Sequence, residues 1–192
     1  MERKILWTGG LLLLLLLIIS ASIAMGNRNH FNGVLISPSP EAHDISSLSD
    51  QNGHHVSLQD LKGKVVLVFF GYTNCPKECP LTLAKMKQVI TGLGDKAKNV
   101  AVVMITTDPS RDTSAQLGNY LSNFNPDFIG LTGPASNLEQ TWNDYGVTVL
   151  DNGETHSALV YVIDKFGKLR LTFSQEMDPS AMFSDVQILL RE

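Results

Sequence analysis

Residues 64–80 read KVVLVFFGYTNCPKECP, and this stretch decides the fold. Residues 64–70 form a continuous β-branched and aromatic run, which is typical of a strand buried on both faces of a sheet. The only two cysteines of the chain, Cys75 and Cys79, follow this run, and apolar residues then recur at helical spacing over residues 80–90. The stretch therefore predicts a buried strand, a short loop that carries two thiols, and a helix.

Strand and helix patterns alternate beyond this segment. We expect a buried strand at residues 100–106, a helix at 113–124 and a short strand at 128–131. A capping box from Ser136 to Glu139 predicts a helix that ends at Gly146.

The last part of the chain predicts a hairpin and a helix. Residues 158–163 and 169–173 have strand character and are joined by a short turn, and Asp178 and Pro179 begin the final helix with proline in its first turn. The whole order indicates an α/β fold with a central mixed β-sheet flanked by helices. Its thiols follow the C-terminal end of a central strand, where open α/β sheets place their sites.

The N-terminal segment has the character of a membrane or export signal. Arg3 and Lys4 precede an uncharged run over residues 5–26, long enough to cross about 30 Å of hydrocarbon as a helix. The basic flank favours a single-pass anchor with the C-terminal part outside the cytoplasm. A cleaved signal peptide is the alternative, because Ser22 and Ala24 form an acceptable cleavage site.

We therefore divide the chain into an anchor or signal segment, residues 1–26, an extended linker, residues 27–43, and one domain, residues 44–192. The chain has 192 residues, of which 43% are apolar, enough for a single sizeable core. Its net charge of −4 offers no basic surface, so nucleic acid is excluded as a partner.

The spacing of the two cysteines leaves several chemistries open. Side chains at i and i+4 share one face of a helix, and a helix N-terminus favours a thiolate. Cys75 and Cys79 could form a disulfide near the upper limit of its geometry, or bind one soft metal ion such as Cu(I) or zinc. Two inert cysteines are the remaining possibility. Outside the cytoplasm a close thiol pair is oxidised unless a reductant or a metal prevents it.

A third metal ligand would have to come from a distant part of the sequence. We expect His54 and His55, beside a turn at residues 50–53, to be exposed, and His30 and His43 to lie in the linker. His156 precedes the predicted strand at 158–163. A single histidine in such a place is more often a surface or core residue than a ligand.

Three separated motifs, in order along the chain, resemble those of the SCO/SenC copper chaperones. They are GYTNCPKECP at residues 71–80, TTDPSRDT at 106–113, and the segment that runs from Tyr145 through His156 to Asp164. The similarity extends over roughly residues 44–190 and is specific, because each motif carries several defined residues.

The resemblance implies a thioredoxin-like fold with an N-terminal membrane anchor, and copper bound by two cysteines and one histidine. On this chain the ligands would be Cys75, Cys79 and His156. Two thiolates and an imidazole suit Cu(I), and with an added oxygen ligand they could also hold Cu(II). We expect Asp108 to act as an outer hydrogen-bond partner or weak fourth ligand, although a turn or cap role is the alternative.

Two residues of the cysteine motif depart from the commonest family pattern. Asn74 stands where histidine is frequent, and Lys77 stands where aspartate is frequent. A cation beside the site favours thiolates but disfavours a bound cation by a modest, screened amount. The sequence therefore predicts which residues bind copper, but not how tightly they bind it.

Two functions follow as expectations. The first is a membrane-anchored copper metallochaperone that serves the copper-site subunit of cytochrome c oxidase or another copper protein. Its domain would lie on the extracytoplasmic side of an inner membrane. In a eukaryote this would be the mitochondrial inner membrane. The alternative is an extracytoplasmic thiol-disulfide oxidoreductase, an enzyme in which Cys75 and Cys79 cycle through a disulfide. Three residues between the cysteines, and no proline between Pro134 and Pro179, depart from thioredoxin-type enzymes and favour metal.

Overall fold

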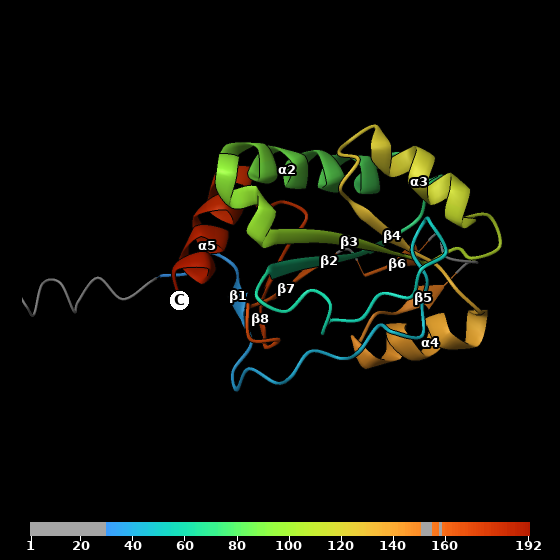
Figure 1. The fold of residues 1–192 in the computed structure, drawn as a ribbon, viewed down its shortest axis with the longest axis horizontal. Coiled ribbons are helices and arrows are strands. Elements are labelled where there is room, and N and C mark those ends of the chain that lie inside the picture. Colours follow the sequence, from blue (N-terminus) through green and yellow to red (C-terminus); the bar gives the residue numbers. More distant parts are fainter. Residues whose placement is uncertain (1–29, 151–154, 158) are drawn as a thin grey trace, which may run out of the picture. The chain divides into compact units, whose positions relative to one another are not determined.

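The computed structural model describes residues 30–150, 155–157 and 159–192. Its centre is a six-stranded mixed sheet with the order β1-β8-β7-β2-β3-β4 (Figure 1). The strands are β1 (Val34–Leu35), β2 (Val65–Gly71), β3 (Val100–Thr106), β4 (Ile129–Leu131), β7 (Val160–Ile163) and β8 (Leu169–Phe173). A separate two-stranded sheet consists of β5 (Val149–Leu150) and β6 (Thr155–His156).

The sheet is parallel on one side of β2 and antiparallel on the other. β2 pairs in parallel with β3, and β3 with β4. β7 runs antiparallel to β2 and forms a hairpin with β8, as predicted. The mixed sheet expected from the alternation of strands and helices is therefore confirmed.

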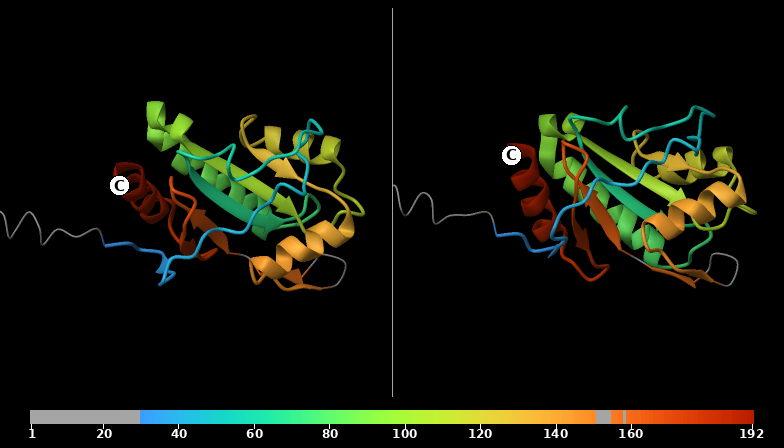
Figure 2. Two further views of the ribbon diagram at one scale, coloured as in Figure 1. Left: turned by 60° about the horizontal axis from the view of Figure 1, so that its bottom comes forward. Right: turned by 90° about the horizontal axis from the view of Figure 1, so that it is seen from below.

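Helices cover both faces of the sheet, and Figures 1 and 2 show α2 and α3 on one face and α4 on the other. The helices are α2 (Glu78–Leu93), α3 (Ser114–Ser122), α4 (Ala135–Asp144) and α5 (Pro179–Arg191), with a 3-10 turn, η1 (Gly94–Asn99), after α2.

Successive side chains of the central strands point to opposite faces of the sheet, so the protein has two hydrophobic cores. Leu67 and Phe69 of β2 face the core beneath α2, α3 and α5, which also contains Cys75 and Cys79. Val68 and Phe70 face the second core, on the side of α4. Because both faces are covered, β2 is buried along its whole length, which explains its uninterrupted apolar sequence.

Local signals placed most helix boundaries correctly. Thr113 caps α3 through a reciprocal capping box with Gln116, and Asp178 caps α5 with Pro179 in the first turn. The capping box expected at Ser136 is wrong. α4 begins two residues earlier than expected, with Pro134 at its N-cap and no side-chain cap, so Ser136 lies inside the helix.

The segment expected to be an extended linker contributes to the domain. Val34 and Leu35 form the edge strand β1 and pair with Thr172 and Leu171 of β8. Just before it, the buried carboxylate of Asp185 on α5 accepts hydrogen bonds from the backbone N–H groups of Asn32 and Gly33, at 3.0 and 2.8 Å. This clamp attaches the chain to the domain well before residue 44. A two-residue strand is too short to show a periodic pattern, so it could not be predicted from the sequence.

No helix in the described part of the chain is long and apolar enough to cross a bilayer. The predicted anchor at residues 5–26 lies outside the described residues.

Candidate metal centre

The two cysteines lie where β2 passes into α2. Cys75 is 8% exposed and Cys79 is fully buried, whereas Asn74, Pro76 and Lys77 around them are exposed. Lys77, at the N-cap of α2, supplies no side-chain cap. Instead the Cys79 backbone N–H donates a hydrogen bond to Cys75 Sγ at 3.3 Å. The first sulfur thus occupies the electropositive end of the helix, a position that suits an anionic ligand.

Both cysteines are free thiols in this structure. Burial raises the pKa of the Cys79 thiol far above its ordinary value, although a backbone hydrogen bond from Tyr72 opposes the effect. The Cys75 thiol lies 4.0 Å from a carboxylate oxygen of Glu78. The pair is therefore asymmetric, with one sulfur near the surface and one deep in the core.

Gly71, the last residue of β2, lies directly against the deeper sulfur. A Cβ at this position would lie 2.9 Å from Cys79 Sγ and 2.7 Å from the ring of Phe69. Both distances are shorter than van der Waals contact allows. The glycine of the motif is thus required by the close approach of the backbone to the thiol.

Asp112 connects the cysteine loop to the end of β3. Its fully buried carboxylate accepts hydrogen bonds from the Thr73 hydroxyl at 2.6 Å, from the Thr73 N–H at 3.1 Å and from the Thr106 hydroxyl at 2.7 Å. Thr73 stands two residues before Cys75. The sequence analysis assigned Asp112 no role beyond its place in the TTDPSRDT motif, because a contact between distant loops leaves no periodic signal.

Asp108 is engaged within its own turn. Ser110 donates a hydrogen bond to one carboxylate oxygen at 2.6 Å, and Arg111 forms an ion pair with the other. Burial alone would raise the pKa of Asp108, but these hydrogen bonds and the guanidinium charge hold it below its usual value. The geometry matches the turn role that we considered as the alternative, and an interaction with a metal ligand stays a prediction.

The backbone brings His156 to the same end of the sheet as the cysteines. His156 lies in β6 opposite Val149, and β7 begins a few residues later with Val160 paired to Phe69 of β2. Because β7 is antiparallel to β2, its start lies beside the end of β2 from which the cysteine loop departs. The side chain of His156 lies outside the described part of the structure.

The remaining histidines, His30, His43, His54 and His55, are all exposed. Exposure of His54 and His55 was expected. Among the side chains that the structure describes, no three His, Cys, Asp or Glu residues are gathered into a metal site. Cys75 and Cys79 are therefore the described part of the predicted ligand set.

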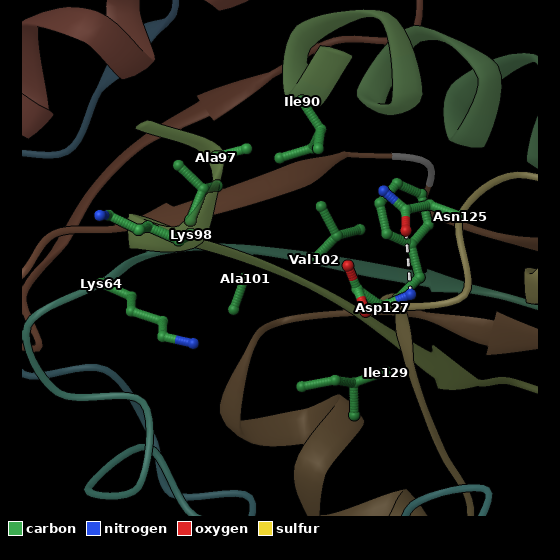
Figure 3. A pocket seen from close by; sticks show the side chains of 11 residues that line it. Lys64, Ile90, Ala97, Lys98, Ala101, Val102, Asn125, Asp127 and Ile129 are labelled. Atoms are coloured by element: carbon green, nitrogen blue, oxygen red, sulfur yellow. Dashed lines mark hydrogen bonds between the residues drawn. The ribbon is translucent and has the colours of Figure 1, made fainter. Parts of the chain in front are cut away.

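A pocket of about 470 Å3 lies at the opposite end of the central strands (Figure 3). It is lined by the beginning of β3, from Val100 to Val102, and by Lys64 and Lys98. The cysteines follow the other end of β2, so this pocket is not part of the thiol site.

The SCO1/SenC family model matches residues 41–191. The chain belongs to this family. An SCO2-like protein of Rickettsia felis is 36% identical over 141 residues, which cover 69% of each chain. SCO1/SenC relatives of known structure share the fold. Copper-bound ScoI of Bradyrhizobium japonicum is 34% identical with a TM-score of 0.71, and the match covers 78% of this chain and 99% of that one.

A second solved SCO relative carries information about thiol chemistry. BsSco, described as a member of the Sco family of cytochrome c oxidase assembly proteins with a disulfide switch, is 27% identical with a TM-score of 0.66. The match covers 80% of this chain and 96% of BsSco. Copper binding and a disulfide switch are thus both recorded for relatives that share this fold.

Proposed function

We propose that this protein is a membrane-anchored copper chaperone that binds copper through Cys75, Cys79 and His156. Its cargo would go to the copper-site subunit of a respiratory oxidase during assembly. The observation that carries the proposal is the pair of free, buried thiols on one turn, joined by the hydrogen bond from the Cys79 N–H to Cys75 Sγ.

The donor set suits copper for two reasons. Thiolate sulfur is a soft ligand that selects Cu(I), and an imidazole completes three-coordination. Both cysteines belong to the core cluster beneath α2, α3 and α5, and the backbone of Gly71 lies against Cys79 Sγ. Such packing fixes the position of the deeper sulfur before metal arrives.

The unusual Lys77 does not oppose this function strongly. Its side chain is exposed, so water and salt screen its charge. Glu78, also exposed, brings a carboxylate to 4.0 Å from Cys75 Sγ. The rim of the site therefore carries one charge of each sign, and the cost to a bound cation is small.

Copper titration of His156→Ala tests the ligand set. We expect the wild-type full chain to bind one Cu(I) and His156→Ala to bind it at least about tenfold more weakly, since one of three ligands is lost. His54→Ala, at an exposed histidine, is the matched control and should bind like wild type. Equal affinity in all three proteins would show that the Cys-Cys-His site is wrong.

A thiol-disulfide exchange activity is the second candidate, and the asymmetry of the cysteines favours it. The Cys75 thiolate, the more exposed sulfur, would attack a partner disulfide and release one partner thiolate. The Cys79 thiolate would then attack Cys75 in the mixed disulfide, release the second partner thiolate and form the Cys75–Cys79 disulfide. Two electrons pass to the partner, which is reduced.

Single cysteine variants separate the two candidates. If exchange occurs, Cys79→Ser should accumulate a mixed disulfide between Cys75 and an oxidised partner fragment of an oxidase subunit, which mass spectrometry would detect. Cys75→Ser should accumulate much less of it, because Cys79 is fully buried. If the wild type binds Cu(I) tightly and neither variant forms a mixed disulfide, the exchange activity is wrong and the chaperone role is the one supported.

A further inference from the structure

The turn between β7 and β8 carries an exposed aromatic side chain. Phe166 is 63% exposed, although turns are usually built from small or polar residues. The Asp164 carboxylate accepts hydrogen bonds from the backbone N–H groups of Phe166 and Lys168, both at 2.9 Å, and these bonds fix the turn. The fold thus holds Phe166 in water, and its side chain belongs to neither hydrophobic core.

Four lysines lie on or beside this turn. They are Lys62, Lys64, Lys165 and Lys168. The loop at residues 62–64 lies against the turn, because the Gly63 N–H donates a hydrogen bond to the Lys165 carbonyl at 3.1 Å. Within the described part of the chain, Lys168 pairs with Glu41, and none of the other three lysines pairs with a carboxylate. We call Phe166 and these four lysines the basic turn.

The nearby carboxylates compensate little of this positive charge. Asp164 is 4% exposed and pairs with Arg170 at 2.9 Å, and Arg170 also pairs with Glu192. Asp60 is exposed and is hydrogen-bonded within its own turn. The lysines therefore dominate the charge that the basic turn presents to solvent.

The described chain begins at the same end of the domain as the basic turn. Phe31 packs against the core, and the guanidinium group of Arg170 lies over its ring, 5.9 Å from the centroid. Arg170 also binds Asp164, the first residue of the turn, so Phe31 and the basic turn are close neighbours. Figures 1 and 2 show the start of the described chain and the C-terminus on the same side of the domain.

This end of the domain would face the membrane. Only residues 27–30 separate Phe31 from the proposed membrane span at residues 5–26. If that span crosses a bilayer, so short a connection keeps Phe31 and the basic turn near the lipid headgroups. Phenylalanine partitions into the membrane interface, and lysines are attracted to anionic headgroups. The chemistry of the basic turn thus matches the surface that it would face.

We propose that the basic turn docks on an anionic membrane surface, with Phe166 between the headgroups and the lysines on the lipid phosphates. The inference rests on the membrane anchor of the proposed function and not on its copper site. Because β7 is antiparallel to β2, the turn lies at the start of β2, and Cys75 follows the other end. The seven residues of β2 span roughly 20 Å. Docking therefore holds the cysteine loop at about this height, facing away from the bilayer.

Lysine acetylation of the full chain in vesicles tests the docking. The vesicles contain phosphatidylcholine alone, or phosphatidylcholine and phosphatidylglycerol in equal amounts. An uncharged, water-soluble reagent is used, and mass spectrometry gives the rate at each lysine. Lys62 and Lys165 should react at least about threefold more slowly in the anionic vesicles. Lys77, exposed beside the cysteines, should react equally in both, and high salt should remove the difference at the other two.

Phe166→Ser separates docking from simple proximity to charged lipid. It should restore most of the neutral-vesicle rate at Lys62 and Lys165, whereas Leu81→Ser, at an apolar residue of α2 that is 54% exposed, should not. Rates that are equal in both vesicles, or slow rates that Phe166→Ser leaves unchanged, would overturn the inference. A full chain that associates with neither vesicle would overturn the anchor as well, and the copper titration would still test the metal site separately.

Discussion

Asp112 holds Thr73 by both its backbone N–H and its hydroxyl, and so joins the end of β3 to the loop that leads into Cys75. The two residues are separated by 39 positions in the sequence. Because Asp112 is fully buried, these hydrogen bonds have no competition from water. The loop that carries the first sulfur is therefore held by a residue from a different loop, the one between β3 and α3.

We predict that Asp112→Asn lowers the free energy of unfolding by about 2–3 kcal/mol, because one buried donor would face the amide NH2 group. Copper affinity should fall with it. Chemical denaturation of the metal-free protein measures the first effect. The exposed Asp127→Asn is the control and should change stability by less than about 0.5 kcal/mol. Equal stability of the two variants would show that the hydrogen bonds between Asp112 and Thr73 do not stabilise the protein.

Gly71→Ala should destabilise the protein by about 1–3 kcal/mol, because its methyl group would overlap both Phe69 and Cys79 Sγ. The same change at Gly92 inside α2 meets only the ring of Phe183, at 3.3 Å. There, the better helix propensity of alanine offsets the tight contact. Thermal unfolding of both variants checks the contrast, and a Gly71→Ala protein as stable as Gly92→Ala would contradict it.

The two thiols should differ in their reaction with iodoacetamide. Cys75 is slightly exposed, whereas Cys79 is fully buried and its pKa is raised. In the folded metal-free protein at neutral pH, Cys79→Ser, which retains Cys75, should react at least about tenfold faster than Cys75→Ser. The rates should converge in denaturant. A faster reaction at Cys79 would reverse the roles assigned to the two sulfurs.

Asp108 should make stability depend on pH on the acid side. Its pKa is lower in the folded protein than in the unfolded chain, so its contribution is present above about pH 4 and is lost as the pH falls through the folded value. Asp108→Asn should therefore narrow the difference in unfolding free energy between neutral and acidic pH. If the unfolding free energy of wild type and variant depends on pH in the same way, the ion pair with Arg111 does not contribute to this dependence.

The sequence was informative where a signal is local. The buried run before the cysteines, the strand at β3, the hairpin of β7 and β8 and the cap at Asp178 were all visible as patterns of adjacent residues. The features that shape the site are not local. Asp112 reaches Thr73 from another loop, and Asp185 reaches Asn32 and Gly33 from the last helix. These carboxylates acquire their partners only after the chain folds.

The clamp of Asp185 on Asn32 and Gly33 limits how far the domain could extend from a membrane. A free linker over residues 27–43 would reach about 58 Å when fully extended. If residues 5–26 cross a bilayer, only residues 27–30, a tether that reaches at most about 14 Å, separate that span from Phe31, which packs against the core. The cysteine loop would then meet only partners whose acceptor site lies close to the same membrane. The length of the tether would thus restrict which proteins can receive copper.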